Sequence, residues 1–365
     1  MVSERLVTKR LATEGHASQG LASEIPVGEM PMNEKPASEK PVSERDVVLQ
    51  AEHVKKYFPV RGLLGNVVGN VKAVDDVSVT LYRGETYGLV GESGCGKSTL
   101  GRTLIKLLDA TAGRIVINGI DITKISQREM RTTMRKKVQM IFQDPYTSLN
   151  PRMRIGEILT EALVIQNVGK PSERMDMVID MLDKVGLRIE HYYRFPHELS
   201  GGQRQRVGFA RAVILNPDIV ICDEPVSALD VSVRSQIINL LLDMQEARGL
   251  TYLFISHDMS VIRYISHRTG VMYLGHIVEE AITDELFADP RHPYTQVLLS
   301  AVPSPDPHIK KNRIILEGDL PSPLNPPPGC VFHTRCPGAM PVCKEAYPPE
   351  IQVSPSHKVA CHRYA

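Results

Sequence analysis

The stretch that decides the fold is Gly91-Glu92-Ser93-Gly94-Cys95-Gly96-Lys97-Ser98-Thr99, which follows the apolar run Tyr87 to Val90. A loop with this spacing turns several backbone N–H groups toward one point, and its glycines leave room there for a phosphate. Lys97 adds positive charge, Ser98 adds a hydroxyl ligand for Mg²⁺, and the helix that begins near Lys97 directs its positive dipole end at the same point. The stretch predicts a site for a nucleoside triphosphate with magnesium. A glycine turn that only caps a helix is the weaker alternative.

The composition is that of a globular chain without a strong net charge. Its 365 residues allow two or three structural units, and 42% hydrophobic residues suffice for a buried core. The 43 basic and 42 acidic residues leave a net charge of +1, which offers no electrostatic footprint for a nucleic acid. No apolar run is long enough to span a membrane, and no secretion signal opens the chain. We therefore expect a cytosolic protein that reaches any membrane through a protein partner.

The first residues differ from the rest of the chain. Residues 1–45 contain no aromatic residue and repeat short motifs, so they cannot bury enough apolar surface to offset their ordering entropy. We interpret them as a disordered tail. Two strand-like segments follow, at 47–54 and 74–81, with a flexible loop expected at 62–69. Tyr57 and Phe58 come just after the first segment, where an aromatic ring can either stack on a nucleobase or pack in the core.

A change to helical periodicity marks residues 144–216. Apolar residues recur at helical spacing from Ile155 to Ile165 and from Met175 to Val185, which predicts a helical insert after a buried strand that ends at Gln143. The last helix of the insert opens with Ser200, Gly201, Gly202 and Gln203. Such a helix start exposes N–H groups and is a second candidate for a phosphate contact, although an ordinary helix cap fits the same residues.

Acidic residues end the next apolar strand, Ile219 to Cys222. Two adjacent carboxylates, Asp223 and Glu224, are costly at the end of a buried strand unless they face a cation or a reaction. Beside a phosphate loop, Asp223 is expected to hold magnesium indirectly and Glu224 to act as a base for an attacking water. His257 follows another apolar strand at the edge where an open α/β sheet binds ligands, although alone it would be read as a surface histidine.

These motifs, in this order, resemble the nucleotide-binding domain of ABC transporters over residues 47–285. The resemblance implies that Phe58, in preference to Tyr57, stacks on adenine, and that Gln143 contacts the magnesium held by Ser98 and Asp223. It also implies that Glu224 is the general base and that His257 contacts the γ-phosphate of ATP. The signature residues then close on ATP held by the other subunit of a dimer; they are Ser200, Gly201, Gly202 and Gln203.

The resemblance also implies the fold and its divisions. We expect an α/β P-loop NTPase of ABC type with an antiparallel β subdomain and a helical signature subdomain. Residues 46–300 form the nucleotide-binding domain, with the helical subdomain at about 144–216. Residues 301–365 form a small, irregular C-terminal lobe that contains cysteines.

Two further segments resemble the ATPase subunits of oligopeptide and dipeptide permeases, Tyr146 to Arg152 and Pro290 to Ser300. The resemblance implies an ATP-hydrolysing subunit at the cytoplasmic face of the membrane that energises peptide uptake. Its partners would be two membrane permease subunits, a second ABC ATPase and an extracytoplasmic peptide-binding protein, with no nucleic acid. An importer ATPase for nickel or another small solute is the alternative. A soluble ABC ATPase that acts on nucleic acid is a further one.

The C-terminal region contains half of the 26 prolines and four of the six cysteines, Cys330, Cys336, Cys343 and Cys361. Five, six and seventeen residues separate these cysteines, and none has the two-residue gap of most structural zinc sites. Zinc stays possible because histidines lie nearby in the sequence, at 333, 357 and 362. The resemblance to permease ATPases implies a structural [4Fe-4S] cluster instead.

Overall fold

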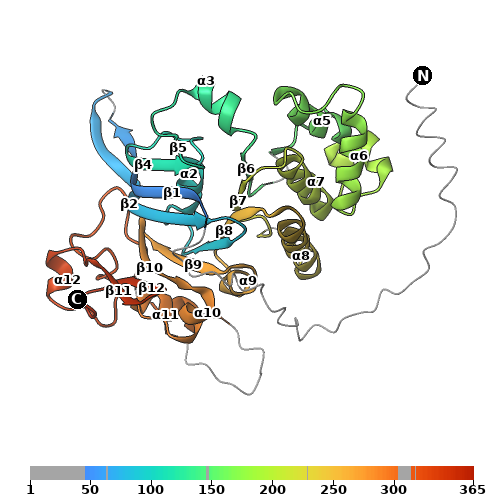
Figure 1. The fold of residues 1–365 in the computed structure, drawn as a ribbon. Helices are drawn as coiled ribbons and strands as arrows, with labels where there is room; N and C mark the ends of the chain where they lie inside the picture. The colour runs from blue at the N-terminus through green and yellow to red at the C-terminus, as the bar shows by residue number, and fades with distance from the viewer. Residues whose placement is uncertain (1–45, 63–64, 145–147, 228, 303–313, 317) are drawn as a thin grey trace, which may run out of the picture. The chain divides into compact units, whose positions relative to one another are not determined.

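The computed structural model describes residues 46–62, 65–144, 148–227, 229–302, 314–316 and 318–365 (Figure 1). The predicted tail at 1–45 lies outside the described residues, as does most of the proline-containing segment that follows residue 302. Part of the motif at 146–152 and one residue of the segment between Ser227 and Asp230 also lie outside them.

A mixed sheet of eight strands forms the centre of the molecule, in the order β11-β12-β10-β9-β3-β8-β7-β6. Its inner strands β3, β7 and β8 are buried at every residue, which explains their unbroken apolar sequences. Neighbours among the last five strands of this order are parallel, so their carboxyl ends meet at one edge. These strands are β9 (Arg268–Tyr273), β3 (Thr86–Val90), β8 (Thr251–Ser256), β7 (Ile219–Asp223) and β6 (Val138–Ile141).

A second, antiparallel sheet has the order β2-β1-β4-β5. Its strands are β1 (Val47–Arg61), β2 (Val67–Tyr82), β4 (Ala112–Ile117) and β5 (Ile120–Asp121). This sheet confirms the expected antiparallel β subdomain. The strands β1 and β2 are longer than the apolar pattern predicted, so β2 takes in the end of the loop expected at 62–69. Asn118 and Gly119 connect β4 to β5 with φ angles of 48° and 77°, as a tight hairpin turn requires.

The helical insert is present, with α5 (Ile155–Ile165), α6 (Arg174–Lys184) and α7 (Gly201–Val213) beside one another (Figure 1). Two short 3₁₀ helices, η3 (Ile189–Tyr193) and η4 (Pro196–Glu198), precede α7. The other helices are α2 (Lys97–Leu104), α3 (Gln127–Glu129), the π-helix η2 (Met130–Met134), α8 (Val231–Arg248), α9 (Met259–Ile265), α10 (Thr283–Ala288), α11 (Pro293–Ser300) and α12 (Val342–Glu345).

The C-terminal region is less irregular than the sequence suggested. The hairpin of β11 (Glu350–Ser354) and β12 (His357–Ala360) joins the central sheet, because β12 pairs antiparallel with β10 (His276–Ile282). A buried hydrogen-bond contact strengthens this junction, with Nε2 of His357 2.7 Å from Oε1 of Glu279. The same glutamate accepts backbone N–H groups of Arg291 and His292. The hairpin is therefore part of the main sheet rather than of a separate lobe.

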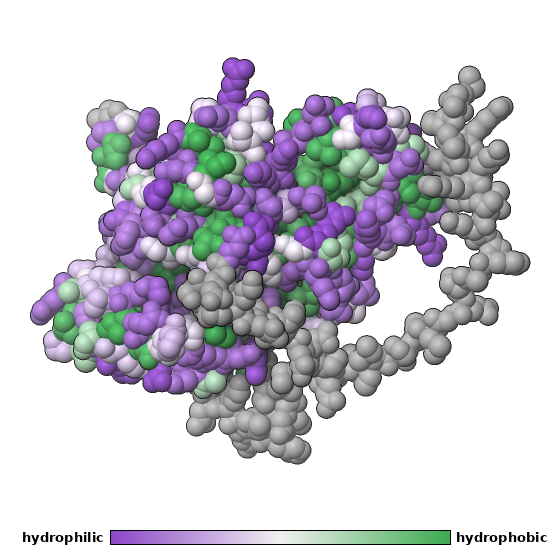
Figure 2. Space-filling model, viewed as in Figure 1, coloured by the Kyte–Doolittle hydropathy of each residue, from purple (hydrophilic) through white to green (hydrophobic). Residues whose placement is uncertain are grey.

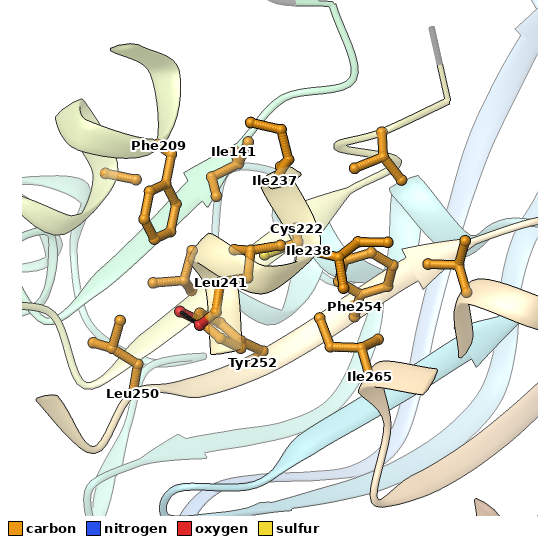
Figure 3. Close-up of a cluster of buried hydrophobic side chains, with 14 of the residues drawn as sticks. Ile141, Phe209, Cys222, Ile237, Ile238, Leu241, Leu250, Tyr252, Phe254 and Ile265 are labelled. Carbon is orange, nitrogen blue, oxygen red and sulfur yellow. Dashed lines mark hydrogen bonds between the residues drawn. The ribbon is translucent and has the colours of Figure 1, made fainter. Parts of the chain in front are cut away.

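A hydrophobic core between the sheet and its helices supports the carboxyl ends of β7 and β8. Figure 3 shows side chains of these strands, among them Cys222 and Phe254, beside Ile237, Ile238 and Leu241 of α8; Phe209 of α7 lies beside Ile141 in the same cluster. The visible outer surface mixes hydrophilic residues with smaller hydrophobic areas (Figure 2). Among the helices in the described ranges, none combines the length and apolar character that crossing a membrane requires.

Candidate active site

The phosphate loop connects β3 to α2 at the carboxyl edge of the sheet, and its glycines are required by the backbone. Gly94 and Gly96 have φ angles of 81° and 108°, which side-chain-bearing residues rarely adopt. A Cβ atom at Gly96 would also lie 2.0 Å from the carbonyl oxygen of Ala73 in β2. The loop can follow this path only with glycine at Gly96, which agrees with the sequence interpretation.

Lys97 lies within the loop and is 4% exposed. Its ammonium group donates to the carbonyl oxygens of Gly91 at 2.7 Å and Glu92 at 2.9 Å. The positive charge is therefore held by the loop itself, where the outer phosphates of a nucleotide are expected. The role of Lys97 at the phosphates stays a prediction.

Ser98 and Asp223 meet across the edge of the sheet. The Ser98 hydroxyl donates to Oδ1 of Asp223 at 2.6 Å, and Nη2 of Arg102 lies 3.4 Å from the other carboxylate oxygen. Asp223 is fully buried, and burial raises the pKa of its carboxyl group while the Ser98 hydrogen bond opposes the rise. A hydroxyl and a carboxylate are ligands that Mg²⁺ prefers, and its charge would offset the cost of burying Asp223. The residues present fit magnesium.

Glu224 lies between two polar side chains from neighbouring strands. Its Oε2 accepts a hydrogen bond from Nε2 of Gln143 at 3.1 Å and lies 3.2 Å from Nδ1 of His257. Glu224 has a φ of 47°, the left-handed region that residues other than glycine avoid, and its N–H donates to the carbonyl of Ile255 in β8. Such strain costs on the order of 1 to 3 kcal/mol and is concentrated at functional sites. The three predicted residues are thus brought together.

The two candidate aromatic residues lie at adjacent positions of β1, so their side chains point to opposite sides of the strand. Phe58 is 37% exposed and lies under the ammonium group of Lys56, 5.0 Å from the ring centre. Tyr57 donates its hydroxyl to Asp75. Phe58 is thus an exposed ring, whereas the Tyr57 hydroxyl is bonded to Asp75; which of the two rings stacks on a base stays a prediction.

The signature residues begin α7 as a capping box. Ser200 accepts a hydrogen bond from the Gln203 N–H at 3.3 Å, and the Gln203 side chain accepts one from the Ser200 N–H at 3.0 Å. Within the described part of the chain, no hydrogen bond or ion pair joins Ser200, Gly201, Gly202 or Gln203 to the phosphate loop. The structure therefore does not bring the signature to the loop of its own chain.

Two residues that the sequence did not indicate contact the phosphate loop. The Glu92 N–H donates to the hydroxyl of Tyr294 in α11 at 2.8 Å, and the Glu92 carboxylate accepts from Nη1 of Arg335 at 2.8 Å. Tyr294 belongs to the segment Pro290 to Ser300, whose resemblance to permease ATPases marked it as a segment of interest but did not indicate a contact with the phosphate loop. Nothing in the sequence pattern indicated Arg335, because 243 positions separate it from Glu92.

The four C-terminal cysteines affect one another electrostatically. Burial raises the pKa of the Cys330 thiol to about 11, the three other cysteines add to the rise, and a backbone N–H from Phe332 opposes it. Cys336 and Cys361 each accept a backbone N–H from the second residue after them. Across the described ranges, no three His, Cys, Asp or Glu side chains are grouped as ligands of a single metal ion. The four cysteine thiols are suitable ligands for iron or zinc, but in the described residues they are not arranged as the ligands of a single metal ion.

Comparison with known families agrees with this geometry. A family model described as "ABC transporter" matches residues 74–227, which span the phosphate loop, the signature and the Asp223-Glu224 pair. A second model, described as "Oligopeptide/dipeptide transporter, C-terminal region", matches residues 278–343 and includes Tyr294 and Arg335.

A solved structure is similar to this chain. The dimeric post-hydrolysis structure of the ATP-binding cassette MJ0796, bound to ADP and Pi, superimposes with a TM-score of 0.59 and 28% identity, covering 64% of this chain and 98% of that one.

Curated relatives are similar over most of their length. The putative oligopeptide transport ATP-binding protein YkfD of Bacillus subtilis (strain 168) is 52% identical over 297 residues, 80% of this chain and 90% of the relative. The oligopeptide transport ATP-binding protein AppF of the same organism is 54% identical over 323 residues, 88% of this chain and 98% of the relative. Because the match extends through the whole relative and includes both the ATP-site motifs and the C-terminal region, the chain belongs to the family of ATP-binding subunits of oligopeptide ABC transporters.

Proposed function

We propose that this subunit binds ATP in the loop of residues 91–99 and hydrolyses it at Glu224 to drive the import of di- and oligopeptides. The observation that carries the proposal is the convergence of Gln143 and His257 on one oxygen of Glu224, beside the bonded pair Ser98 and Asp223. Together these residues place a base, a buried carboxylate and a hydroxyl next to an anion-binding loop.

The phosphates are bound by the loop and its lysine. Backbone N–H groups of the loop and the N-terminus of α2 face the anion, and Lys97 exchanges its bonds to the loop carbonyls for bonds to the outer phosphates. Ser98, Gln143 and Asp223 are the residues that would hold Mg²⁺ in this proposal. When bound, magnesium neutralises charge that develops on the phosphate oxygens.

Glu224 acts as the general base in this proposal. Its carboxylate accepts the proton of a water molecule whose oxygen attacks the γ-phosphorus of ATP, and the bond to the β–γ bridging oxygen breaks as ADP leaves. Gln143 and His257 hold the reactive carboxylate from two sides and limit its rotation. His257 is positioned to contact the γ-phosphate as well. The strained φ of Glu224 keeps the carboxylate at this edge rather than in the direction the strand would give it.

The complete ATP site is proposed to form between two ATPase subunits. The signature residues lie at a helix N-terminus, which suits an anion, but they make no contact with their own phosphate loop in the described residues. ATP bound by one subunit is then contacted by Ser200 and Gly202 of the other. The dimeric cassette MJ0796 bound to ADP and Pi supports this arrangement. A second, different ABC ATPase is the expected partner.

The remaining partners follow from the transport function. Since the described helices include no membrane span, two integral membrane permease subunits are proposed to form the channel. The chain then works at the cytoplasmic face of the membrane, and an extracytoplasmic protein delivers the peptide. The ATPase itself does not bind the peptide.

The four C-terminal cysteines are proposed to hold a [4Fe-4S] cluster with a structural role. Four thiolates suit such a cluster, and N–H groups directed at sulfur are a feature that stabilises thiolate ligands. Because burial raises the pKa of Cys330 to about 11, its thiol stays protonated at neutral pH without metal. A zinc ion with a histidine ligand is the alternative.

Peptide uptake tests the proposed function. Cells that lack this chain should fail to import labelled di- and oligopeptides, the wild-type chain should restore uptake, and Lys97→Ala should not. Restored nickel uptake with unchanged peptide uptake would assign the chain to the alternative cargo. Retained peptide uptake in the absence of the chain would reject the proposal.

A further inference from the structure

Glu92 of the phosphate loop is held at three points. Its N–H donates to the Tyr294 hydroxyl at 2.8 Å, its carbonyl accepts from Lys97 at 2.9 Å, and its carboxylate accepts from Arg335 at 2.8 Å. The bond from Lys97 comes from within the loop, as does a second bond to the same carbonyl from the Cys95 N–H at 3.3 Å. The other two come from Tyr294 and Arg335, in the region after residue 290.

Arg335 is itself held in a fixed position. Its side chain is 9% exposed, and its N–H donates to the carbonyl of Phe332 in the turn between Cys330 and Cys336. Phe332 is buried against Tyr273 and Tyr294, with ring centres 5.1 Å and 5.4 Å apart. The guanidinium group therefore reaches Glu92 from a packed base and loses little side-chain entropy in doing so.

We infer that Arg335 is a positioning residue for ATP binding, which fixes the phosphate loop through the carboxylate of Glu92. The ATP site then depends on the turn at residues 330–336, so the C-terminal region is a structural part of the nucleotide site. The inference rests on the proposed ATP-binding function. Gly91, Gly94 and Gly96 all have positive φ, so the loop backbone has little intrinsic rigidity and its anion-binding shape needs outside support.

The physical consequence concerns affinity more than chemistry. Among the residues that the structure describes, no hydrogen bond or ion pair joins Arg335 to Glu224, His257 or the proposed magnesium ligands, so we assign it no role on the attacking water. Without its bond, the loop would sample conformations whose N–H groups do not converge, and ATP would have to select the competent one. The Kd for ATP should rise, and kcat should change little once the site is saturated.

The test is equilibrium binding of MgATP to the full-length chain with Arg335→Met, which keeps the length of the side chain and removes its charge. We expect the Kd to rise about tenfold, within the usual range of coupling between sites. Arg335→Lys should recover part of the affinity. The matched control is Arg268→Met, because Arg268 is also an arginine with buried ion pairs to glutamates, Glu85 and Glu280, but it begins β9 beside the amino end of β3, away from the loop. It should lower the melting temperature without changing the Kd.

A double-mutant cycle separates positioning from a general loss of stability. Glu92→Gln should raise the Kd by a similar factor, and adding Arg335→Met to it should cost less than twofold more. Additive effects of the two substitutions, or a Kd for Arg335→Met equal to that of the wild type, would overturn the inference. If Arg335→Met fails to fold, the double variant Glu92→Gln with Tyr294→Phe weakens the support of the loop at Glu92 and at Tyr294 instead. An unchanged Kd for ATP in that variant would overturn the inference. A wild-type chain that binds no ATP would instead reject the proposed function.

Discussion

Gln143 donates a hydrogen bond to Glu224 over 3.1 Å, and this bond joins the end of β6 to the end of β7 at the carboxyl edge of the sheet. Gln143 is also the last residue before the helical insert, which carries the signature. The side chain that orients the proposed base is therefore placed to respond to movement of that insert. In this arrangement, closure of two subunits over ATP and activation of Glu224 would occur together.

The signature serine should matter for hydrolysis beyond its role as a helix cap. Ser200→Ala removes the cap, which costs about 1 kcal/mol of stability, whereas Ser200→Asp keeps a good capping side chain. We expect both variants to lose hydrolysis in the assembled transporter while ATP affinity of the isolated subunit stays unchanged. Full hydrolysis by Ser200→Asp would reduce the role of Ser200 to capping. Equal loss of ATP affinity in the isolated subunit would place the signature beside its own loop.

Phe58 should contribute to adenine binding. Stacking of a base on an aromatic ring is worth about 1–3 kcal/mol, so Phe58→Ala should weaken ATP binding by about tenfold. Tyr57→Phe, which removes only the hydroxyl bonded to Asp75, should bind ATP as the wild type does. Titration of each variant with a fluorescent ATP analogue measures the effect. A loss confined to Tyr57→Ala, with Phe58→Ala unaffected, would transfer the stacking role to Tyr57.

The C-terminal cysteines should bind iron. Chain purified without oxygen should be brown, with about four irons and four sulfides per chain, as a [4Fe-4S] cluster requires. Cys343→Ser should lose the iron. Cys222→Ala, which alters a buried cysteine of β7 outside the group, should keep it. A colourless wild-type protein with one zinc per chain would overturn the cluster.

His292 should make the chain less stable in mild acid. Burial, with a smaller contribution from the charge of Arg363, lowers the pKa of His292 to about 3, and its backbone N–H is bonded to Glu279. The unfolded chain takes up a proton near pH 6.5 but the folded chain does not, so stability from this group is complete above pH 6.5 and is lost as the pH falls toward 3. Between pH 7 and pH 5 the loss is about 2 kcal/mol.

Urea denaturation of two variants checks the role of His292. His292→Asn keeps a side chain that can accept the Tyr294 N–H at the start of α11, so the stability difference between pH 7 and pH 5 should shrink by about 2 kcal/mol. His197→Asn, which changes an exposed histidine, should retain the wild-type difference. An unchanged difference in His292→Asn would contradict the assignment.

The parts of the structure that the sequence predicted well are those with a local cause. The helix Ile155–Ile165 has the bounds that its apolar spacing predicted, and the fully buried β7 follows from an unbroken apolar run. The loop glycines and Lys97 follow from the chemistry of phosphate binding. Gln143, Glu224 and His257 each end or follow a strand, so a parallel sheet brings them to one edge.

The parts that it did not predict depend on contacts between distant segments. The strands β11 and β12 are short, and proline-containing sequence precedes them, so nothing local marked them as an extension of the central sheet. The bond from Arg335 to Glu92 depends on how a cysteine-flanked turn packs on Tyr273 and Tyr294. An isolated arginine in a turn has no pattern that identifies its partner.

Hydrolysis by Glu224→Gln in the assembled transporter tests the central claim most directly, because this change keeps the shape of the side chain and removes its ability to accept a proton. ATP binding, measured on the same preparation, should stay within about twofold of the wild type, and turnover should fall by at least about 100-fold, the usual scale for losing a general base. Hydrolysis at a rate near that of the wild type would contradict the account, because the proton of the attacking water would then be accepted by another group.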